Sequence, residues 1–255
     1  MQPSLPNSPQ QGPENKYPSC LYMKLEGIPV QAKHNEALEF WQKPAYKQQI
    51  ELRLTIKFDQ QWESLKRGRI RFGLRGGELK LKLEGGEIPY ESRELIGSFE
   101  LVLPHHRPEN QVIAEHKNIE LPLADLNIKD NKTGAQAHFA KEQSSEEIRL
   151  SVCHISTIVS EENPTWIFEP EKGSQVLNGL LNRAKLATLN VLSLPCRIEA
   201  TFAVNRRDIC LTDAQGLWPL NLSRNKRAVL DKLIIQRLLE PKLKPYISRA
   251  ELQYD

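Results

Sequence analysis

Alternation of apolar and polar residues is the clearest pattern in this chain, and it predicts β-strands. From Ile50 to Phe58 every second residue is apolar, and the residues between them are Glu, Arg, Thr and Lys. Cys196 to Val204 alternates in a similar way. Successive side chains of a strand point to opposite faces, so each segment predicts a half-buried strand whose apolar face is turned inward.

Shorter apolar runs, separated by turn-forming residues, predict further strands. These runs cover Leu95 to Leu103, Ile148 to Ile158, Thr165 to Glu169, Leu186 to Leu192, Ile209 to Leu211 and Tyr246 to Tyr254. Trp166 and Phe168 are expected in the core. Many short strands are typical of a sandwich or of a sheet closed on itself. We therefore predict an all-β fold of mainly antiparallel, sandwich-like sheets with one C-terminal α-helix.

The pair Gly76-Gly77 lies between two alternating segments, Arg69 to Arg75 and Glu78 to Glu84. A Gly-Gly pair between two strands favours a two-residue β-hairpin. In that register three apolar pairs fall on one face: Leu74 with Leu79, Phe72 with Leu81, and Ile70 with Leu83. The opposite face then forms a basic ribbon that includes Arg69, Arg71, Lys80 and Lys82.

One helix is predicted over residues 224–240, because Ser223 is a capping residue and Pro241 cannot continue a helix. Its apolar residues cover most of the circumference: Val229, Leu230, Leu233, Ile234, Ile235, Leu238 and Leu239. Lys232, Gln236 and Glu240 leave only a narrow polar stripe. We therefore expect the helix to pack against a sheet on more than one side.

Polar segments suggest boundaries along the chain. Residues 1–20 are rich in Pro, Gln, Ser and Asn, which predicts a disordered tail. A polar stretch over residues 127–145 and a break at residues 160–164 permit two β units, over residues 21–159 and 160–255. One continuous domain is the alternative.

The composition is that of an ordinary globular protein, with 39% hydrophobic and 26% charged residues. The N-terminal residues lack a secretory pattern, and no apolar run approaches the roughly 20 residues of a membrane span, so a cytoplasmic protein without membrane contact is expected. Cys20, Cys153, Cys196 and Cys210 are far apart in the sequence. That spacing predicts reduced thiols rather than disulfides or a zinc site.

Charge is segregated along the chain, although the net charge is only +3. Residues 41–85 carry +6, residues 86–182 carry −8 and residues 183–255 carry +6. Such segregation attracts an anionic partner or lets copies associate head to tail, unless folding pairs the opposite charges. The helix start carries Arg224, Lys226 and Arg227, where the helix dipole disfavours cations and a bound anion would relieve the repulsion.

The predicted contact surface for nucleic acid or another anionic partner combines the hairpin with the helix start. Its residues are Arg67, Arg69, Arg71, Lys80, Lys82, Arg206, Arg207, Arg224, Lys226 and Arg227. The alternative interpretation is a set of solvated charges that protect strand edges against aggregation. Trp218, in a Gly-Leu-Trp-Pro segment, is either a partner anchor or a core residue.

Catalytic and cofactor motifs are absent from the sequence: there is no nucleophile elbow, P-loop or dinucleotide-binding pattern, so no cofactor or small-molecule substrate is expected. His105, His106 and His116 lack the spacing of a metal site. Cys153 and His154 are neighbours on a predicted strand and should point to opposite faces. The glutamate pairs at 146–147 and 161–162 are expected to be solvated.

These patterns leave three function classes. We favour a non-catalytic binding or assembly protein whose basic surfaces meet an anionic protein partner or another copy of the chain. The alternative is a nucleic-acid-binding subunit of a ribonucleoprotein, for which the ribbon lacks exposed aromatic residues between its cations. A hydrolase with residues scattered along the sequence is the least favoured class.

Overall fold

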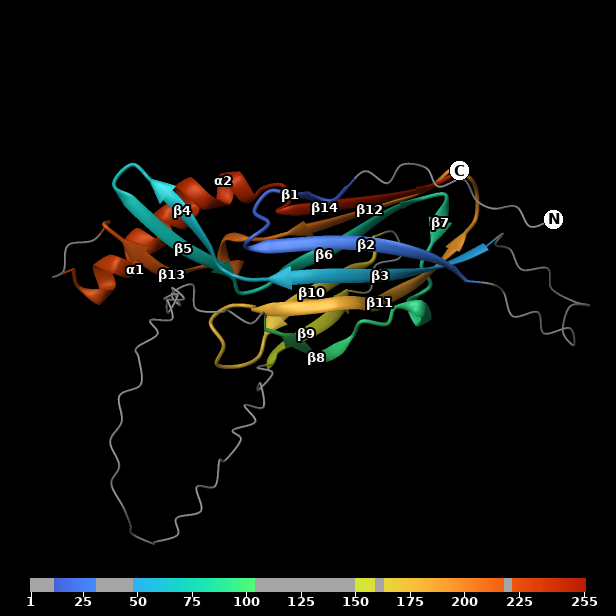
Figure 1. The fold of residues 1–255 in the computed structure, drawn as a ribbon, viewed down its shortest axis with the longest axis horizontal. Helices are drawn as coiled ribbons and strands as arrows, with labels where there is room; N and C mark the ends of the chain where they lie inside the picture. The colour runs from blue at the N-terminus through green and yellow to red at the C-terminus, as the bar shows by residue number, and fades with distance from the viewer. Residues whose placement is uncertain (1–11, 31–47, 104–149, 159–162, 218–221) are drawn as a thin grey trace, which may run out of the picture. The chain divides into compact units, whose positions relative to one another are not determined.

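The computed structural model describes residues 12–30, 48–103, 150–158, 163–217 and 222–255. Strands predominate in these ranges, and the strands pair antiparallel in two sheets. Sheet A has eleven strands and sheet B has three. One α-helical segment follows near the C-terminus (Figure 1). The predicted all-β class with a single C-terminal helix is confirmed.

Sheet A ends on one side in the two-residue strand β1 and on the other in the ten-residue strand β2. Its strands are β1 (Glu14–Asn15), β2 (Leu21–Val30), β3 (Gln48–Phe58), β6 (Gly77–Glu84), β7 (Gly86–Glu87), β8 (Gly97–Val102), β9 (Leu150–Ile158), β10 (Thr165–Pro170), β11 (Gly179–Val191), β12 (Cys196–Ala203) and β14 (Ser248–Tyr254). The order in space is β1-β14-β12-β6-β10-β9-β8-β11-β3-β2, with β7 on β11. Strands from both sides of residue 160 share this sheet, because β6 lies between β10 and β12.

The predicted inward faces of β3 and β12 form much of the core. Ile50, Leu52, Leu54, Ile56 and Phe58 are buried on β3, and every second residue of β12 from Cys196 is buried as well. Trp166 and Phe168 are also buried, as expected from the sequence. The rings of Phe58, Phe168 and Phe202 contact one another with centroids 5.5–5.9 Å apart, which joins three strands of sheet A.

The two ends of sheet A approach each other, so the sheet is nearly closed (Figure 1). Asn15 on β1 connects them: its Oδ1 accepts hydrogen bonds from the backbone N–H of Met23 on β2 and from the hydroxyl of Ser248 on β14. Tyr254 of β14 lies over Gly27 of β2, where a Cβ would be 1.9 Å from the tyrosine hydroxyl oxygen. Gly27 is therefore required for this close approach.

The predicted tail of residues 1–20 is too long. Residues 1–11 lie outside the described ranges, but Glu14 and Asn15 pair with β14, and Cys20 is fully buried. A two-residue strand is too short to show apolar–polar alternation, so composition alone does not predict β1. The hydrogen bonds of Asn15 hold this strand in the sheet. Polar side chains here are used for hydrogen bonds to the two neighbouring strands.

The predicted Gly76-Gly77 hairpin is wrong. β5 (Gly68–Leu74) belongs to sheet B and pairs with β4 (Gln61–Leu65) and β13 (Ile209–Gln215), whereas β6 pairs with β10 and β12 in sheet A. Neither glycine has a positive φ. A Cβ at Gly77 would lie 2.3 Å from the Phe202 ring, and one at Gly76 would lie 2.6 Å from the Phe168 carbonyl oxygen. The pair is therefore needed for close packing where the chain crosses between sheets.

The helical segment runs beyond the predicted limit at Pro241. It consists of α1 (Arg224–Ile234), a π-helical turn η3 (Ile235–Leu239) and α2 (Glu240–Leu243). Pro241 lies in the first turn of α2, where its missing N–H is tolerated, and the wider π turn before it leaves room for the proline ring. None of the helices in the described ranges is long and apolar enough to cross a membrane.

The helix is also far less buried than predicted. Leu239 and Leu243 are buried, and Ile234 and Ile235 are half-buried against the core. α1 itself has no buried residue, and Val229, Leu233 and Leu238 are 61%, 38% and 40% exposed. The expectation that the helix packs on more than one side is therefore wrong, because α1 contacts the protein along one side only.

Candidate functional site

The ten residues of the predicted contact surface are spread over four elements of the structure. Lys80 and Lys82 are on β6 in sheet A. Arg67 lies at the turn before β5, and Arg69 and Arg71 are on β5 in sheet B. Arg206 and Arg207 are in the 3-10 turn before β13, and Arg224, Lys226 and Arg227 are in the first turn of α1. The single basic ribbon predicted from the hairpin does not exist, because its two halves belong to different sheets.

Cations on sheet A are paired with carboxylates. Every lysine and arginine in the described strands of sheet A has an ion pair, and the pairs are mostly with glutamates on the same or neighbouring strands. Lys80 pairs with Glu78 at 2.8 Å, and Lys82 pairs with Glu84 at 3.2 Å. The positive charge that the sequence assigned to Lys80 and Lys82 is therefore largely neutralised locally.

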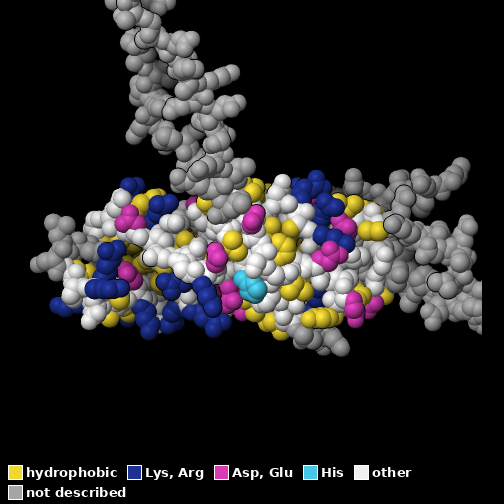
Figure 2. Space-filling view, turned by 90° about the horizontal axis from the view of Figure 1, so that it is seen from below, with side chains coloured by type: hydrophobic (Ala, Val, Ile, Leu, Met, Phe, Trp, Pro, Cys, Tyr) yellow, Lys and Arg dark blue, Asp and Glu magenta, His cyan; other side chains and the backbone are white. Residues whose placement is uncertain are grey.

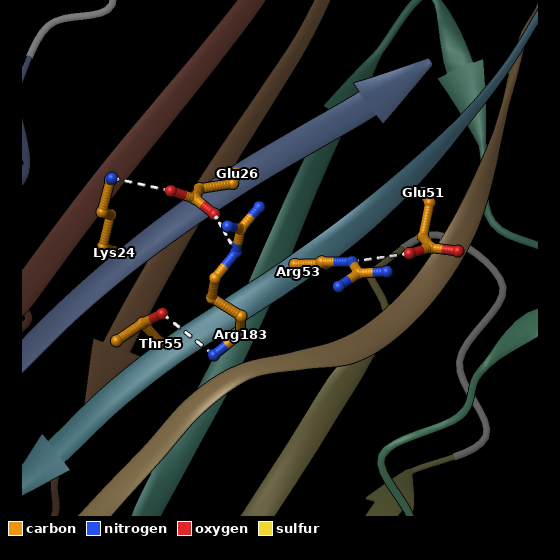
Figure 3. Close-up of polar contacts among 6 residues, drawn as sticks. All are labelled: Lys24, Glu26, Glu51, Arg53, Thr55 and Arg183. Atoms are coloured by element: carbon orange, nitrogen blue, oxygen red, sulfur yellow. Dashed lines mark hydrogen bonds and ion pairs between the residues drawn. The ribbon is translucent and has the colours of Figure 1, made fainter. Parts of the chain in front are cut away.

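Figure 3 shows this pairing on β2, β3 and β11. Glu26 accepts from Lys24 at 2.7 Å and pairs with Arg183 at 3.0 Å. The hydrogen bond from Lys24 is the main cause that lowers the pKa of Glu26. Arg183 sits at a register shift of β11 with φ 49°, and its backbone N–H donates to the Thr55 hydroxyl, which holds the guanidinium over Glu26.

The outer face of sheet B presents two arginines beside a tryptophan. Trp62 on β4 is the cross-strand partner of Arg71. The Arg69 guanidinium carbon lies 4.5 Å from the centre of a Trp62 ring, and its Nε donates to Gln215 at 2.7 Å. Neither Arg69 nor Arg71 forms an ion pair with a residue in the described ranges. The aromatic residue that the β5 sequence lacked is thus supplied by the neighbouring strand.

A groove of about 810 Å³ lies between the start of β13 and the helix. Its cationic lining residues are Arg75, Arg206, Arg207 and Lys232, and its anionic lining residues are Asp231 and Glu240. A second hollow of about 460 Å³ adjoins it and shares Arg75 and Arg207. The backbone N–H of Arg75 donates to the carbonyl of Asp208, which fixes the end of β5 beside the 3-10 turn η2 (Arg206–Asp208).

The cations of this groove differ in how they are paired. Arg206 donates to Glu240 at 2.8 Å, and Lys244 pairs with the same carboxylate at 2.7 Å. These two hydrogen bonds, that from Lys244 first, lower the pKa of Glu240. Arg207 is 84% exposed and reaches only its neighbour Asp208, at 3.7 Å. Arg75 and Lys232 have no ion pair with any residue that the structure describes.

Asp231 is the one carboxylate on the side of α1 that faces the groove. Burial raises the pKa of Asp231, and the charge of Arg227 acts in the opposite direction. Arg224 and Ala228 share this side, because they lie seven and three residues before Asp231. The predicted residue Lys226 lies on the other side of α1 and does not line the groove. The helix start is therefore divided between two surfaces.

We use the name basic end for sheet B, the residues that flank its strands (66, 67, 75 and 206–208) and residues 224–243. Ten of its cations have no ion pair with a described residue: Lys66, Arg67, Arg69, Arg71, Arg75, Arg224, Lys226, Arg227, Lys232 and Arg237. Figure 2 shows lysine and arginine side chains gathered toward the end where Figure 1 places these elements. Lys242 is an exception, because it pairs with Glu63 on β4 and attaches α2 to sheet B.

Catalytic and metal candidates from the sequence gain no support. Cys153 is fully buried, and burial raises the pKa of its thiol to about 12, while His154 is exposed. Their side chains lie on opposite faces, as expected. Within the described ranges no three His, Cys, Asp or Glu residues cluster to hold a metal. His105, His106, His116, Trp218 and the glutamates at 146–147 and 161–162 lie outside the described residues.

Comparison with known proteins adds little. No protein-family model and no curated protein sequence matches this chain. Among the solved structures that match, one described as a pore forming protein is 9% identical, with 71% of this chain and 78% of that chain covered. The TM-score is 0.23, and a similarity at that level supports no inference about fold or activity.

Three contributors to the basic end were missing from the sequence prediction: Trp62, Arg75 and Lys232. Trp62 and Arg75 lie beside the predicted ribbon in sequence, but their roles depend on the pairing of β5 with β4 and on the crossing at Gly76. Lys232 was assigned to the solvated stripe of the helix, and that stripe in fact faces the groove. Helical spacing shows which residues share a side, although it does not show which side is covered.

Proposed function

We propose that this protein is a non-catalytic binding or assembly protein, and that its basic end engages an anionic partner. The observation that carries the proposal is the difference in charge pairing. Cations in the sheet A strands have carboxylate partners, while ten cations of the basic end have none among the described residues. Unpaired surface charges of one sign attract a partner of opposite charge over about 10 Å at ordinary salt.

A protein partner is favoured by the apolar residues within the basic end. Val229, Leu233 and Leu238 remain exposed beside the cations. Protein interfaces commonly combine an apolar centre with a polar rim, whereas phosphate recognition needs cations alone. This combination supports protein assembly as the first candidate.

The proposal is tested with two charge-reversal variants that change the same number of cations. The basic-end variant carries Arg75→Glu, Arg207→Glu and Lys232→Glu, and the control carries Lys24→Glu, Lys80→Glu and Lys82→Glu on sheet A. Complexes isolated gently from the native source, with nuclease present, are compared by size and composition. We expect the control to keep its partner and the basic-end variant to lose it.

Two results would count against the proposal. Wild-type protein recovered only as free monomer under these conditions would leave no partner for the basic end. Equal retention by both variants would place the contact elsewhere on the molecule. Thermal unfolding of each variant is the check that the substitutions have not simply unfolded it.

Single-stranded nucleic acid is a second candidate, and the Trp62 face of sheet B favours it. Trp62 is half-buried with the Arg69 guanidinium over its ring, and the uncovered part of the ring is available to stack on a base while Arg69 binds a phosphate. A fluorescent oligothymidylate should then bind with strong salt dependence, and Trp62→Ala should weaken it by a factor of about 5 to 100. Binding that is unaffected by Trp62→Ala and Arg69→Glu would exclude this face as the nucleic-acid site.

A further inference from the structure

The outer side of α1 carries two exposed apolar residues between two cations. Lys226, Val229, Leu233 and Arg237 follow one another at spacings of three, four and four residues, which places them along one side of a helix. All four are exposed, and Val229, at 61%, is the most exposed large hydrophobic residue among those described. We call this side the helix stripe. The groove lies on the opposite side, where Ala228, Asp231, Lys232 and Ile235 face β13.

Neither Val229 nor Leu233 belongs to the core or is packed against it. The helix is attached through Leu239 and Leu243, which are buried, and through the ion pair of Lys242 with Glu63. Val229 and Leu233 are left 61% and 38% exposed by this attachment. Exposed aliphatic residues at i and i+4 on a well-supported helix are the arrangement that a second helix packs against.

We propose that the helix stripe binds an acidic amphipathic helix of a partner protein. The partner would place leucine-like residues over Val229 and Leu233 and carboxylates beside Lys226 and Arg237. Neither cation has an ion pair with a described residue, so both are free to meet those carboxylates. This inference rests on the proposed function and specifies the partner's chemistry.

The residues of the helix stripe argue against three other partners: a second copy of the chain, a nucleic acid and a membrane. In a second copy of the chain the stripe would present Lys226 and Arg237 again, so cations would face cations in a pairing of two stripes. A nucleic acid has phosphates for the cations, but aliphatic side chains do not stack on its bases. Membrane-surface helices commonly add aromatic anchors at the interface, and residues 224–243 contain no aromatic residue.

The inference is tested by fluorescence anisotropy with a labelled synthetic peptide. The peptide is a helix of about 18 residues with leucines along one side and glutamates on both flanks, long enough to be helical in solution. Polyglutamate of the same length serves as the purely electrostatic probe. Oligothymidylate and vesicles of phosphatidylglycerol with phosphatidylcholine are the competing probes.

Three double variants separate the contributions. Val229→Ala with Leu233→Ala removes the apolar contact, and Lys226→Glu with Arg237→Glu reverses the flanking charges. Lys66→Glu with Arg67→Glu, at the β4–β5 turn, is the control with the same change of charge. Each of the first two variants should weaken peptide binding by about tenfold or more, and the control variant should weaken it by less than about threefold.

The outcomes distinguish this inference from the proposed function. Equal peptide affinity of the wild type and the Val229→Ala, Leu233→Ala variant would overturn the inference, while polyglutamate binding would leave the proposed function standing. Vesicles or oligothymidylate that bind more tightly than the peptide, and that depend on Val229 and Leu233, would also overturn it. If neither the peptide nor polyglutamate binds at about 50 µM protein, the Kd is roughly 10⁻⁴ M or weaker. That result would contradict the inference and the proposed function together.

Discussion

Sheet A and the basic end differ in how their surface cations are paired. On sheet A, lysines and arginines lie next to glutamates, as in the Lys24, Glu26 and Arg183 contacts. In the basic end, Arg75, Lys232 and Arg237 have no such neighbour within the described part of the chain. Paired charges screen one another at short range, whereas unpaired charges of one sign project a field into solvent. The difference shows that the distribution of carboxylates, rather than the number of cations, determines where unpaired positive charge remains on the described surface.

The same two regions differ in how apolar residues are used. In sheet A the apolar side chains of alternating strands are buried almost completely. In the helical segment, neighbouring residues have opposite environments: Leu239 is fully buried and Leu238 is 40% exposed. The helix is therefore anchored at its C-terminal part, and α1 is available as a surface.

The largest effect should come from this anchor. Leu239→Ala is expected to lower the free energy of unfolding by about 2–5 kcal/mol, because it removes a buried leucine and leaves a cavity. Leu238→Ala is the matched control, with an expected loss below about 1 kcal/mol. Urea unfolding of both variants measures the difference. Equal losses would show that the helix does not contact the core as described.

The crossing between the two sheets provides the next test. Gly77→Ala should lower the free energy of unfolding by about 1–3 kcal/mol, because the added Cβ meets the Phe202 ring and the Ala203 carbonyl. Gly12→Ala, where no atom lies within 4 Å of the new Cβ, should have little effect. Thermal unfolding compares the two. Unchanged stability of Gly77→Ala would contradict the close approach of Gly77 to Phe202 and Ala203.

Alkaline pH should destabilise the region around sheet A. Burial raises the pKa of the Cys20 thiol from 9.0 to about 12 and that of the Tyr254 hydroxyl from 10.0 to about 12. Between those values the folded protein holds protons that the unfolded chain releases, so stability is complete below pH 9 and falls as pH rises toward 12. Urea midpoints measured from pH 8 to 11 should decrease. Tyr254→Phe should flatten the decrease above pH 10, and midpoints that stay constant would contradict the burial.

The smallest effect concerns the charges themselves. Arg249 pairs with Glu199 at 3.0 Å and with Glu251 at 3.5 Å, so Arg249→Gln should lower the free energy of unfolding by about 0.2–1 kcal/mol. Arg75→Gln, which breaks no ion pair with a described residue, should have no measurable effect. Both measurements belong at low salt, because 1 M salt should remove the difference. Equal losses would remove the contrast between the two regions.

For the alternating strands, the sequence was sufficient to predict which residues face inward. Alternation identified the buried sides of β3 and β12, and it placed Phe72 and Leu81 in the core, where the structure confirms them. It could not identify the partners of a strand, because Ile70 and Leu83 satisfy the same pattern in a hairpin and in two separate sheets. The Gly76-Gly77 pair was interpreted as a turn, although its small size serves the approach of Phe168 and Phe202.

The candidate site could be only partly predicted from the sequence, for a related reason. Lys80 and Arg69 are equivalent as basic residues of alternating strands, but Lys80 has Glu78 beside it and Arg69 has Trp62. That distinction depends on side-chain contacts between strands far apart in sequence. The exposed side of α1 was similarly hidden, since helical spacing does not show that Leu239 is covered and Leu233 is not. The basic end therefore appears only after the chain is folded.

Binding of labelled polyglutamate as a function of salt measures the contrast between the two regions in a single experiment. The basic-end variant, with Arg75→Glu, Arg207→Glu and Lys232→Glu, is compared with the sheet A control, with Lys24→Glu, Lys80→Glu and Lys82→Glu. We expect the control to bind within about threefold of the wild type and the basic-end variant to bind about tenfold more weakly or worse at low salt. Equal weakening of the two variants would show that both regions attract anions alike, and that the basic end is not a distinct contact surface.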